Sequence, residues 1–210
     1  MRLLNFMLAP IVFAIISPVT QANDKYYMVV FASQTELKIP RGSHSFAAFV
    51  KVSGDDPTKR ETVCISWLPK SMQIDSFELP EEGHNLCLPD TLEWTRKLNA
   101  KVTMWGPYAI KPELYEMAAK HVKYLESKPI GYVVIDKDFR GKRASNCIHA
   151  LADLVLNREP LDSGTFFGVS ASEAIVKHFQ PFIVKTDEPL AWLVEHLKLD
   201  RTKYKIGKPE

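Results

Sequence analysis

The first half of the chain alternates apolar and polar residues in the way that strands do. Residues 26–32 form a short apolar run of β-prone residues, which predicts a buried strand. Residues 43–52 follow a period of two that puts His44 at the head of the apolar, inward face. A turn over residues 53–57 leads to a second strand at 61–68. The pattern therefore predicts a hairpin with a long connection.

Helical spacing dominates the second half. Pro112 stands at the start of a predicted helix of about four turns, after a strand at 100–105 that Gly106–Pro107 is expected to end. Residues 170–173 have the capping-box pattern ahead of a helix at 174–179, and Pro189 opens a last helical segment. Residues 69–89 show no sustained period and are interpreted as an irregular excursion.

A lone cysteine stands where another helix is expected to begin. Asn146 is a favoured N-cap type directly before Cys147, and apolar residues follow at helical spacing from Ile148 to Val155. Backbone N–H groups at a helix start favour a negative charge, and such positions lower a cysteine pKa from about 8.5 to roughly 3.5–7.5. Cys147 is therefore the candidate nucleophile.

The amino terminus has the order of a secretory signal peptide. A short basic start is followed by an apolar run at 6–16 and a small residue, Ala22, before polar sequence. We expect residues 1–22 to be removed, leaving residues 23–210 as a single domain in the periplasm or outside the cell. The apolar run is short for a membrane span, although an uncleaved anchor is the alternative.

The net charge and the cysteines indicate which classes of function and which disulfides the chain could have. The 210-residue chain carries a net charge of +2, which gives no support to nucleic-acid binding. In an oxidising compartment, Cys64 and Cys87 could pair and stabilise the fold by roughly 3 kcal/mol, leaving Cys147 as a thiol. The alternative is that both are buried, unbridged cysteines.

A thiol nucleophile needs a base, and His44 is the best placed of six histidines. A histidine at a strand start on the inward face can meet a helix that packs on the same sheet. His149 lies about 200° around the helix from Cys147 and points away from it. Cys147 and His149 have no second ligand pair at zinc-like spacing, so no metal site is predicted.

Three motifs resemble a known family when they are taken in order. They are Gly-Ser-His-Ser-Phe-Ala at 42–47, Ile-Ser-Trp-Leu-Pro at 65–69 and Ala-Ser-Asn-Cys-Ile-His-Ala-Leu at 144–151. They resemble the circularly permuted NlpC-type branch of the papain-like cysteine hydrolases, which includes lecithin retinol acyltransferase-like proteins. The resemblance covers about residues 26–156. It implies an α+β fold, in which an antiparallel sheet packs against a helix that carries the nucleophile at its N-terminus.

The resemblance also implies roles for single residues. Cys147 resembles the nucleophile and His44 the base. Ser66 stands at the third polar position, where relatives have a histidine, and Thr62 is another candidate on the same strand face. Tyr132 is the choice for a side chain that stabilises the oxyanion.

These residues predict an exported thiol hydrolase, a cysteine peptidase or amidase that cleaves an amide or ester through an acyl-enzyme on Cys147. Export makes cell-wall peptides (peptidoglycan) the first substrate class, and lipid esters, for an acyltransferase or lipase, the second. Arg140, Lys142 and Arg143 either form a solvated basic loop or bind acidic substrates. No nucleotide or metal motif is found, so no cofactor is implied. The alternative is a binding or inhibitory protein that keeps the fold with an incomplete triad.

Overall fold

The structure is a computed structural model that describes residues 24–37, 39, 42–54, 56, 58–74, 79–127, 130–135, 144–155, 161 and 167–209. The predicted signal peptide at 1–22 lies outside these residues. The basic residues Arg140, Lys142 and Arg143 lie outside them too. Within the described part of the chain, no helix is long and apolar enough to cross a membrane.

The main sheet is built around two long, buried strands. Its order is β10 (Ile206–Gly207), β6 (Lys101–Ile110), β1 (Lys25–Gln34), β2 (Ser43–Val52) and β3 (Arg60–Ile65), and β9 (Ile183–Val184) also pairs with β6. Every pairing is antiparallel except that of β10 with β6. The predicted hairpin of β2 and β3 is confirmed, and β3 ends the sheet on one side.

A smaller sheet continues from the end of β3. It consists of β4 (Trp67–Pro69), β5 (Glu81–Asn85), β7 (Gly131–Tyr132) and β8 (Ala144–Ser145), in that order. The prediction that residues 69–89 are wholly irregular is therefore wrong. The sequence of β5, Glu-Glu-Gly-His-Asn, is polar and short, so its strand comes from pairing with β4 and β7 rather than from local propensity.

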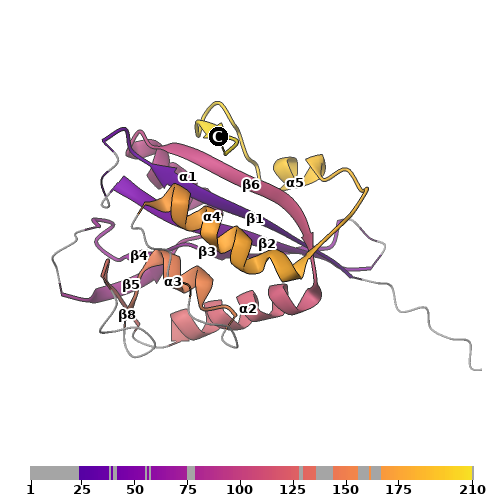
Figure 1. Cartoon of the computed structure of the whole chain (residues 1–210), viewed down its shortest axis with the longest axis horizontal. Coiled ribbons are helices and arrows are strands. Elements are labelled where there is room, and N and C mark those ends of the chain that lie inside the picture. Colours follow the sequence, from indigo (N-terminus) through magenta and orange to yellow (C-terminus); the bar gives the residue numbers. More distant parts are fainter. Residues whose placement is uncertain are drawn as a thin grey trace, which may run out of the picture.

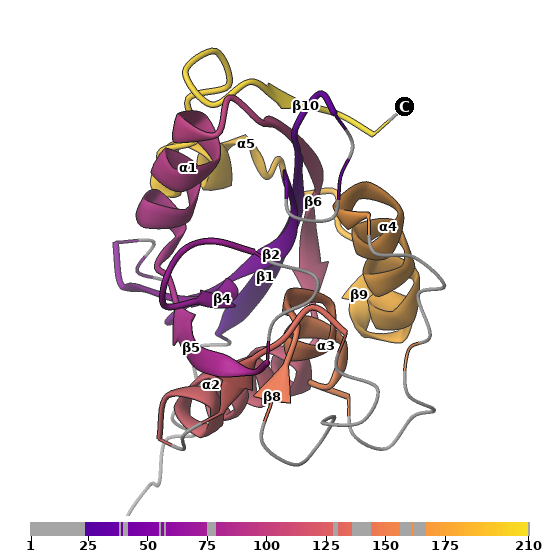
Figure 2. The same ribbon diagram turned by 90° about the vertical axis from the view of Figure 1, so that its left-hand side faces the viewer.

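Helices cover both faces of the main sheet (Figures 1 and 2). They are α1 (Leu88–Lys97), α2 (Pro112–Ser127), α3 (Cys147–Ala152), α4 (Gly168–Phe179) and α5 (Ala191–His196). Figure 2 shows α1 and α5 on one side of the sheet and α2, α3 and α4 on the other. The α+β class predicted from the sequence is confirmed for the described residues.

The alternation of β1 and β2 divides the core into two clusters. Phe31 and Phe46 face α1 and α5, and their rings stack with centroids 5.0 Å apart. Ala47 and Phe49 face the other side, in the cluster that also holds Cys147 and residues of α2 and α4. A residue's position in the period of two on β2 therefore decides which cluster it joins.

Two local predictions are wrong. Strand β6 does not end at Gly106–Pro107, because a bulge opposite β1 accommodates one extra residue, with Gly106 at a φ of 91° that favours glycine. Helix α4 begins at Gly168 with Phe167 as its N-cap, so the predicted capping box does not form. Ser172 is buried inside that helix, where its Oγ donates to the carbonyl of Phe31.

Candidate functional site

Helix α3 begins at Cys147, as the sequence predicts. Asn146 is the extended N-cap residue, and its Oδ1 accepts the N–H of His149 at 2.8 Å. Its Nδ2 donates to the carbonyl of Val134 at 3.2 Å, which ties the start of the helix to the preceding segment. The Cys147 side chain lies in the core, and the residue is 7% exposed.

His44 is buried in a polar network on β2. Its Nε2 is hydrogen-bonded to the Oγ of Ser66 at 2.9 Å, and that oxygen lies 2.8 Å from the Oγ1 of Thr91 in α1. Nδ1 is also buried and has no hydrogen-bond partner in the described part of the chain. Burial lowers the pKa of His44 to about 3, so the ring is neutral at physiological pH.

His44 lies on the face of β2 that carries Phe46, and the two rings stack with centroids 5.5 Å apart. Its ring also meets the ring of Trp94 edge-on, with centroids 5.5 Å apart, and Trp94 belongs to the core cluster that contains Cys147. The neighbouring Ser45 faces the other side, where its Oγ donates to the carbonyl of Gly168 in α4. Helix α3 packs on that side, with α4 and with the cluster that contains Cys147.

The structure thus joins His44 to Ser66, two of the predicted site residues. The catalytic roles of Cys147 and His44, and the supporting role of Ser66, stay predictions. Thr62, the other candidate for the third position, is hydrogen-bonded at 3.1 Å to the Nε2 of His196 instead.

Tyr132 lies in the same core cluster as Cys147 and is 5% exposed. Strand β7 pairs in parallel with β8, which puts Tyr132 opposite Ser145, two residues before the cysteine. The strand pairing therefore brings Tyr132 beside the segment that leads into α3. Its role toward an oxyanion stays a prediction.

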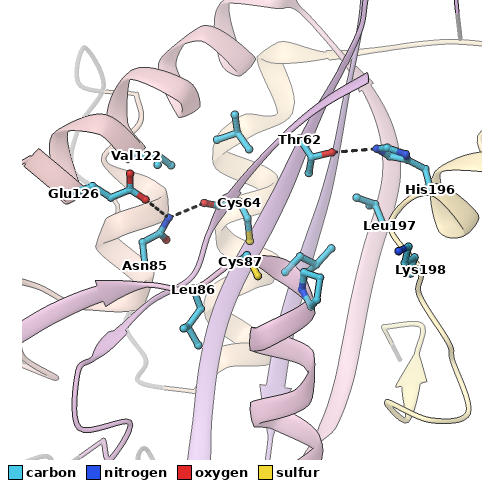
Figure 3. A pocket seen from close by; sticks show the side chains of 13 residues that line it. Thr62, Cys64, Asn85, Leu86, Cys87, Val122, Glu126, His196, Leu197 and Lys198 are labelled. Carbon is cyan, nitrogen blue, oxygen red and sulfur yellow. Dashed lines mark hydrogen bonds between the residues drawn. The ribbon is translucent and has the colours of Figure 1, made fainter. Parts of the chain in front are cut away.

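A groove of about 510 Å³ runs beside β3 (Figure 3). We call it the β3 groove. Its walls come from four segments: β3, the stretch between β5 and α1, α2, and the end of α5. Its lining includes apolar and polar residues, among them Thr62, Cys64, Asn85, Cys87, Leu88, Val122, Glu126, His196, Leu197 and Lys198.

Asn85 forms one end of this groove. Its Nδ2 donates to the carbonyl of Cys64 at 3.0 Å and lies 3.4 Å from Oε1 of Glu126 in α2. A second cavity, also of about 510 Å³, is lined by the same two side chains together with Trp67 and residues of β5. Asn85 and Glu126 therefore lie in the linings of both cavities.

Alternate residues of β3 direct their backbone N–H and C=O groups away from β2, toward the groove. The N–H of Ser53 donates to the carbonyl of Lys59, which makes these two residues a hydrogen-bonded pair just beyond the ends of β2 and β3. Such pairs recur at every second position of an antiparallel ladder, so the next hydrogen-bonded pairs between β2 and β3 are 51 with 61, 49 with 63 and 47 with 65. Thr62 and Cys64 therefore point their N–H and C=O groups away from β2. The bond from Asn85 to the carbonyl of Cys64 agrees with this direction.

Sequence reasoning missed the β3 groove. Its walls come from segments far apart in the chain, and the stretch before α1 carries no periodic signal. Among the described residues, no three His, Cys, Asp or Glu side chains are grouped to hold a metal ion. Comparisons with family models, with curated proteins and with solved structures found no match to this chain.

Proposed function

We propose that this chain is a binding protein that takes an extended peptide into the β3 groove. The observation that carries the proposal is the outer side of β3, the strand at which the described part of the main sheet ends. It directs the backbone of Thr62 and the N–H of Cys64 toward a cavity of about 510 Å³, while the carbonyl of Cys64 already accepts from Asn85. Such a volume lies within the range of roughly 300–1,000 Å³ typical of ligand sites. A peptide can add to a sheet edge by main-chain hydrogen bonds.

The lining favours a peptide over a lipid chain. A hydrocarbon tail offers no partner to outward N–H and C=O groups, and leaving such groups dry costs about 1–3 kcal/mol each. A peptide backbone satisfies them, while Leu88, Val122 and Leu197 offer apolar surface to its side chains. Charged Arg60 and Glu61 begin the strand, so the half of β3 around Thr62 is the part suited to pairing.

Two variants at one position test this function. Peptides selected from a random library against the full chain are measured by titration calorimetry. Thr62→Pro removes an N–H that faces the groove, which an edge strand tolerates, and should weaken binding about tenfold. Thr62→Ala keeps that N–H and loses only the hydroxyl contact with His196, so it should bind nearly as wild type. Equal affinities for the two variants would argue against strand addition.

A thiol hydrolase that acts through Cys147 on an amide or an ester is the second candidate. It is favoured by Cys147 as the first residue of α3, capped by Asn146. Against it stands the partner of His44, whose Nε2 is already hydrogen-bonded to the Oγ of Ser66. The hydrolase needs His44 to reach the sulfur, whereas the binding protein does not.

Alkylation separates the two candidates. In a Cys64→Ser, Cys87→Ser chain, labelling of Cys147 by a small neutral reagent is followed from pH 5 to 9. The binding protein predicts labelling slower than in the urea-unfolded chain, and a pH profile that His44→Gln leaves unchanged. Fast labelling below pH 7 that His44→Gln slows would favour the hydrolase.

We further propose that the fold is a permuted NlpC-type papain-like arrangement and that the protein is exported. The first proposal is supported by the order of a strand that carries His44 before a helix that begins at Cys147, and by the packing of that helix on the sheet. The second is supported by the sequence of residues 1–22.

A further inference from the structure

The β3 groove brings together two cysteines that are far apart in the sequence. Cys64 lies near the end of β3, and Cys87 is the N-cap residue of α1. Both are thiols in this structure and both line the groove. Figure 3 shows their sulfur atoms facing each other across it.

Strand pairing fixes this neighbourhood. Trp67 pairs with Asn85, and the N–H of Leu86 donates to the carbonyl of Ser66 at 3.0 Å, one step further along the same ladder. Cys87 directly follows Leu86 and so lies beside the end of β3, where Cys64 stands. Both side chains line the β3 groove.

The two sulfurs differ in access. Cys87 is exposed, and its Sγ lies 3.0 Å from Oδ2 of Asp90, whereas Cys64 is half-buried by residue. Burial raises the pKa of both thiols, and the carboxylate of Asp90 raises that of Cys87 further. Both thiols are therefore protonated at neutral pH and react only after losing that proton. The exposed one is open to a reagent from solution.

We propose that Cys64 and Cys87 are a disulfide site, oxidised by exchange with an external disulfide such as oxidised glutathione. Cys87, once deprotonated, attacks the external disulfide, forms a mixed disulfide and releases one thiol. The sulfur of Cys64 then gives up its proton and attacks Sγ of Cys87, which forms the protein disulfide and releases the second thiol. The protein loses two electrons and two protons, and the external disulfide is reduced to two thiols.

The bridge would join the edge of β3 to the start of α1 across the groove. It would close the chain segment that contains β4 and β5, and so restrict the unfolded chain more than the folded one. For a loop of this length, the melting temperature should rise by roughly 6–12 °C. This inference is independent of the proposed function, because the bridge requires only the two thiols and an oxidant.

Thiol counting tests the proposal on the full chain. The reduced protein is equilibrated with a glutathione redox buffer, quenched in acid, unfolded, labelled with a maleimide and weighed. We expect one labelled cysteine, Cys147, and a peptide that links Cys64 to Cys87 after digestion. Three labelled cysteines in strongly oxidising buffer, a link to Cys147, or glutathione retained on Cys87 would each overturn the proposal.

Variants check the order of the steps. Cys64→Ser should leave Cys87 with bound glutathione, because the second attack is lost. Cys147→Ser should still form the bridge. The melting temperatures of the oxidised and reduced forms of the same wild-type chain are compared directly, so the result does not depend on a variant folding. Equal melting temperatures would contradict a bridge that constrains this segment.

Discussion

The Nε2 atom of His44 lies 2.9 Å from the Oγ of Ser66, and both residues are completely buried. Thr91 extends this network into α1, so β2, the end of β3 and α1 are joined by polar contacts inside an otherwise apolar region. A buried polar network of this kind stabilises one arrangement of the elements, because any alternative leaves its members without partners. Its first consequence concerns stability rather than catalysis.

Removal of the central hydroxyl should destabilise the fold. Ser66→Ala leaves His44 Nε2 and the Oγ1 of Thr91 without this partner, at a cost of about 1–3 kcal/mol in the free energy of unfolding. Ser71→Ala, at an exposed serine in the same part of the chain, should change that energy by less than about 0.5 kcal/mol. Urea unfolding measures both. A Ser66→Ala chain as stable as wild type would show that the network contributes nothing.

Buried, neutral His44 should also make stability depend on pH. Its pKa is about 3 in the folded chain and roughly 6.5 when unfolded, so the unfolded state binds more protons between these values. The contribution of neutral His44 to the free energy of unfolding is therefore present above pH 6.5 and is lost as the pH falls. The free energy of unfolding should drop by about 2 kcal/mol between pH 7 and pH 5 for this reason.

The control for this pH dependence is His44→Gln, which keeps a polar group but does not titrate. Unfolding energies of both chains at pH 7 and pH 5 give the difference that belongs to His44, since the other titrating groups are common to both. The loss between the two pH values should be smaller in the variant by about 2 kcal/mol. Identical losses would mean that the ring is charged or exposed in the folded chain.

Gly83 is required by the packing of Trp67. A Cβ atom at this position would lie 1.9 Å from Cζ2 of the indole, and Trp67 is buried. Gly83→Ala should therefore cost about 1–3 kcal/mol of stability. Gly207→Ala is the control, because a Cβ there meets nothing within 4 Å. Thermal unfolding compares the two, and equal stabilities would contradict the packing of β4 on β5.

The proposed export predicts the mass of the mature protein. If residues 1–22 are a signal peptide, protein recovered from the periplasm or the medium should begin at Asn23. Intact-mass measurement identifies that terminus directly. Recovered protein that still begins at Met1 would rule out cleavage.

Sequence periodicity predicted the elements whose burial is regular. The alternation through β2 and the helical spacing after Pro112 and Cys147 have direct physical causes, because one face of each element must pack on the core. Strand β5 lacks such a pattern and depends on distant partners. Gly106–Pro107 reads locally as a break, yet pairing with β1 continues on both sides of it.

The candidate site was predictable only in part. Asn146 and Cys147 carry a local signal, the N-cap, and the structure has the helix start there. The face of β2 that meets α3 cannot be read from the period of two, which separates the two faces without saying which element covers each. His44 and Cys147 were expected together; the structure puts His44 on the face of β2 that carries Phe46, and a contact between His44 and Cys147 stays a prediction.

Strand addition at β3 is tested most directly by an N-methyl scan of a selected peptide. Each backbone amide is methylated in turn, and affinity for the full chain is measured. Our account predicts a loss of about tenfold at the peptide amide that faces Thr62 and a smaller loss at the one that faces Cys64, whose carbonyl already accepts from Asn85. The amide between these two should change the affinity little. A scan without a period of two, or a peptide that binds equally well when every amide is methylated, would contradict it.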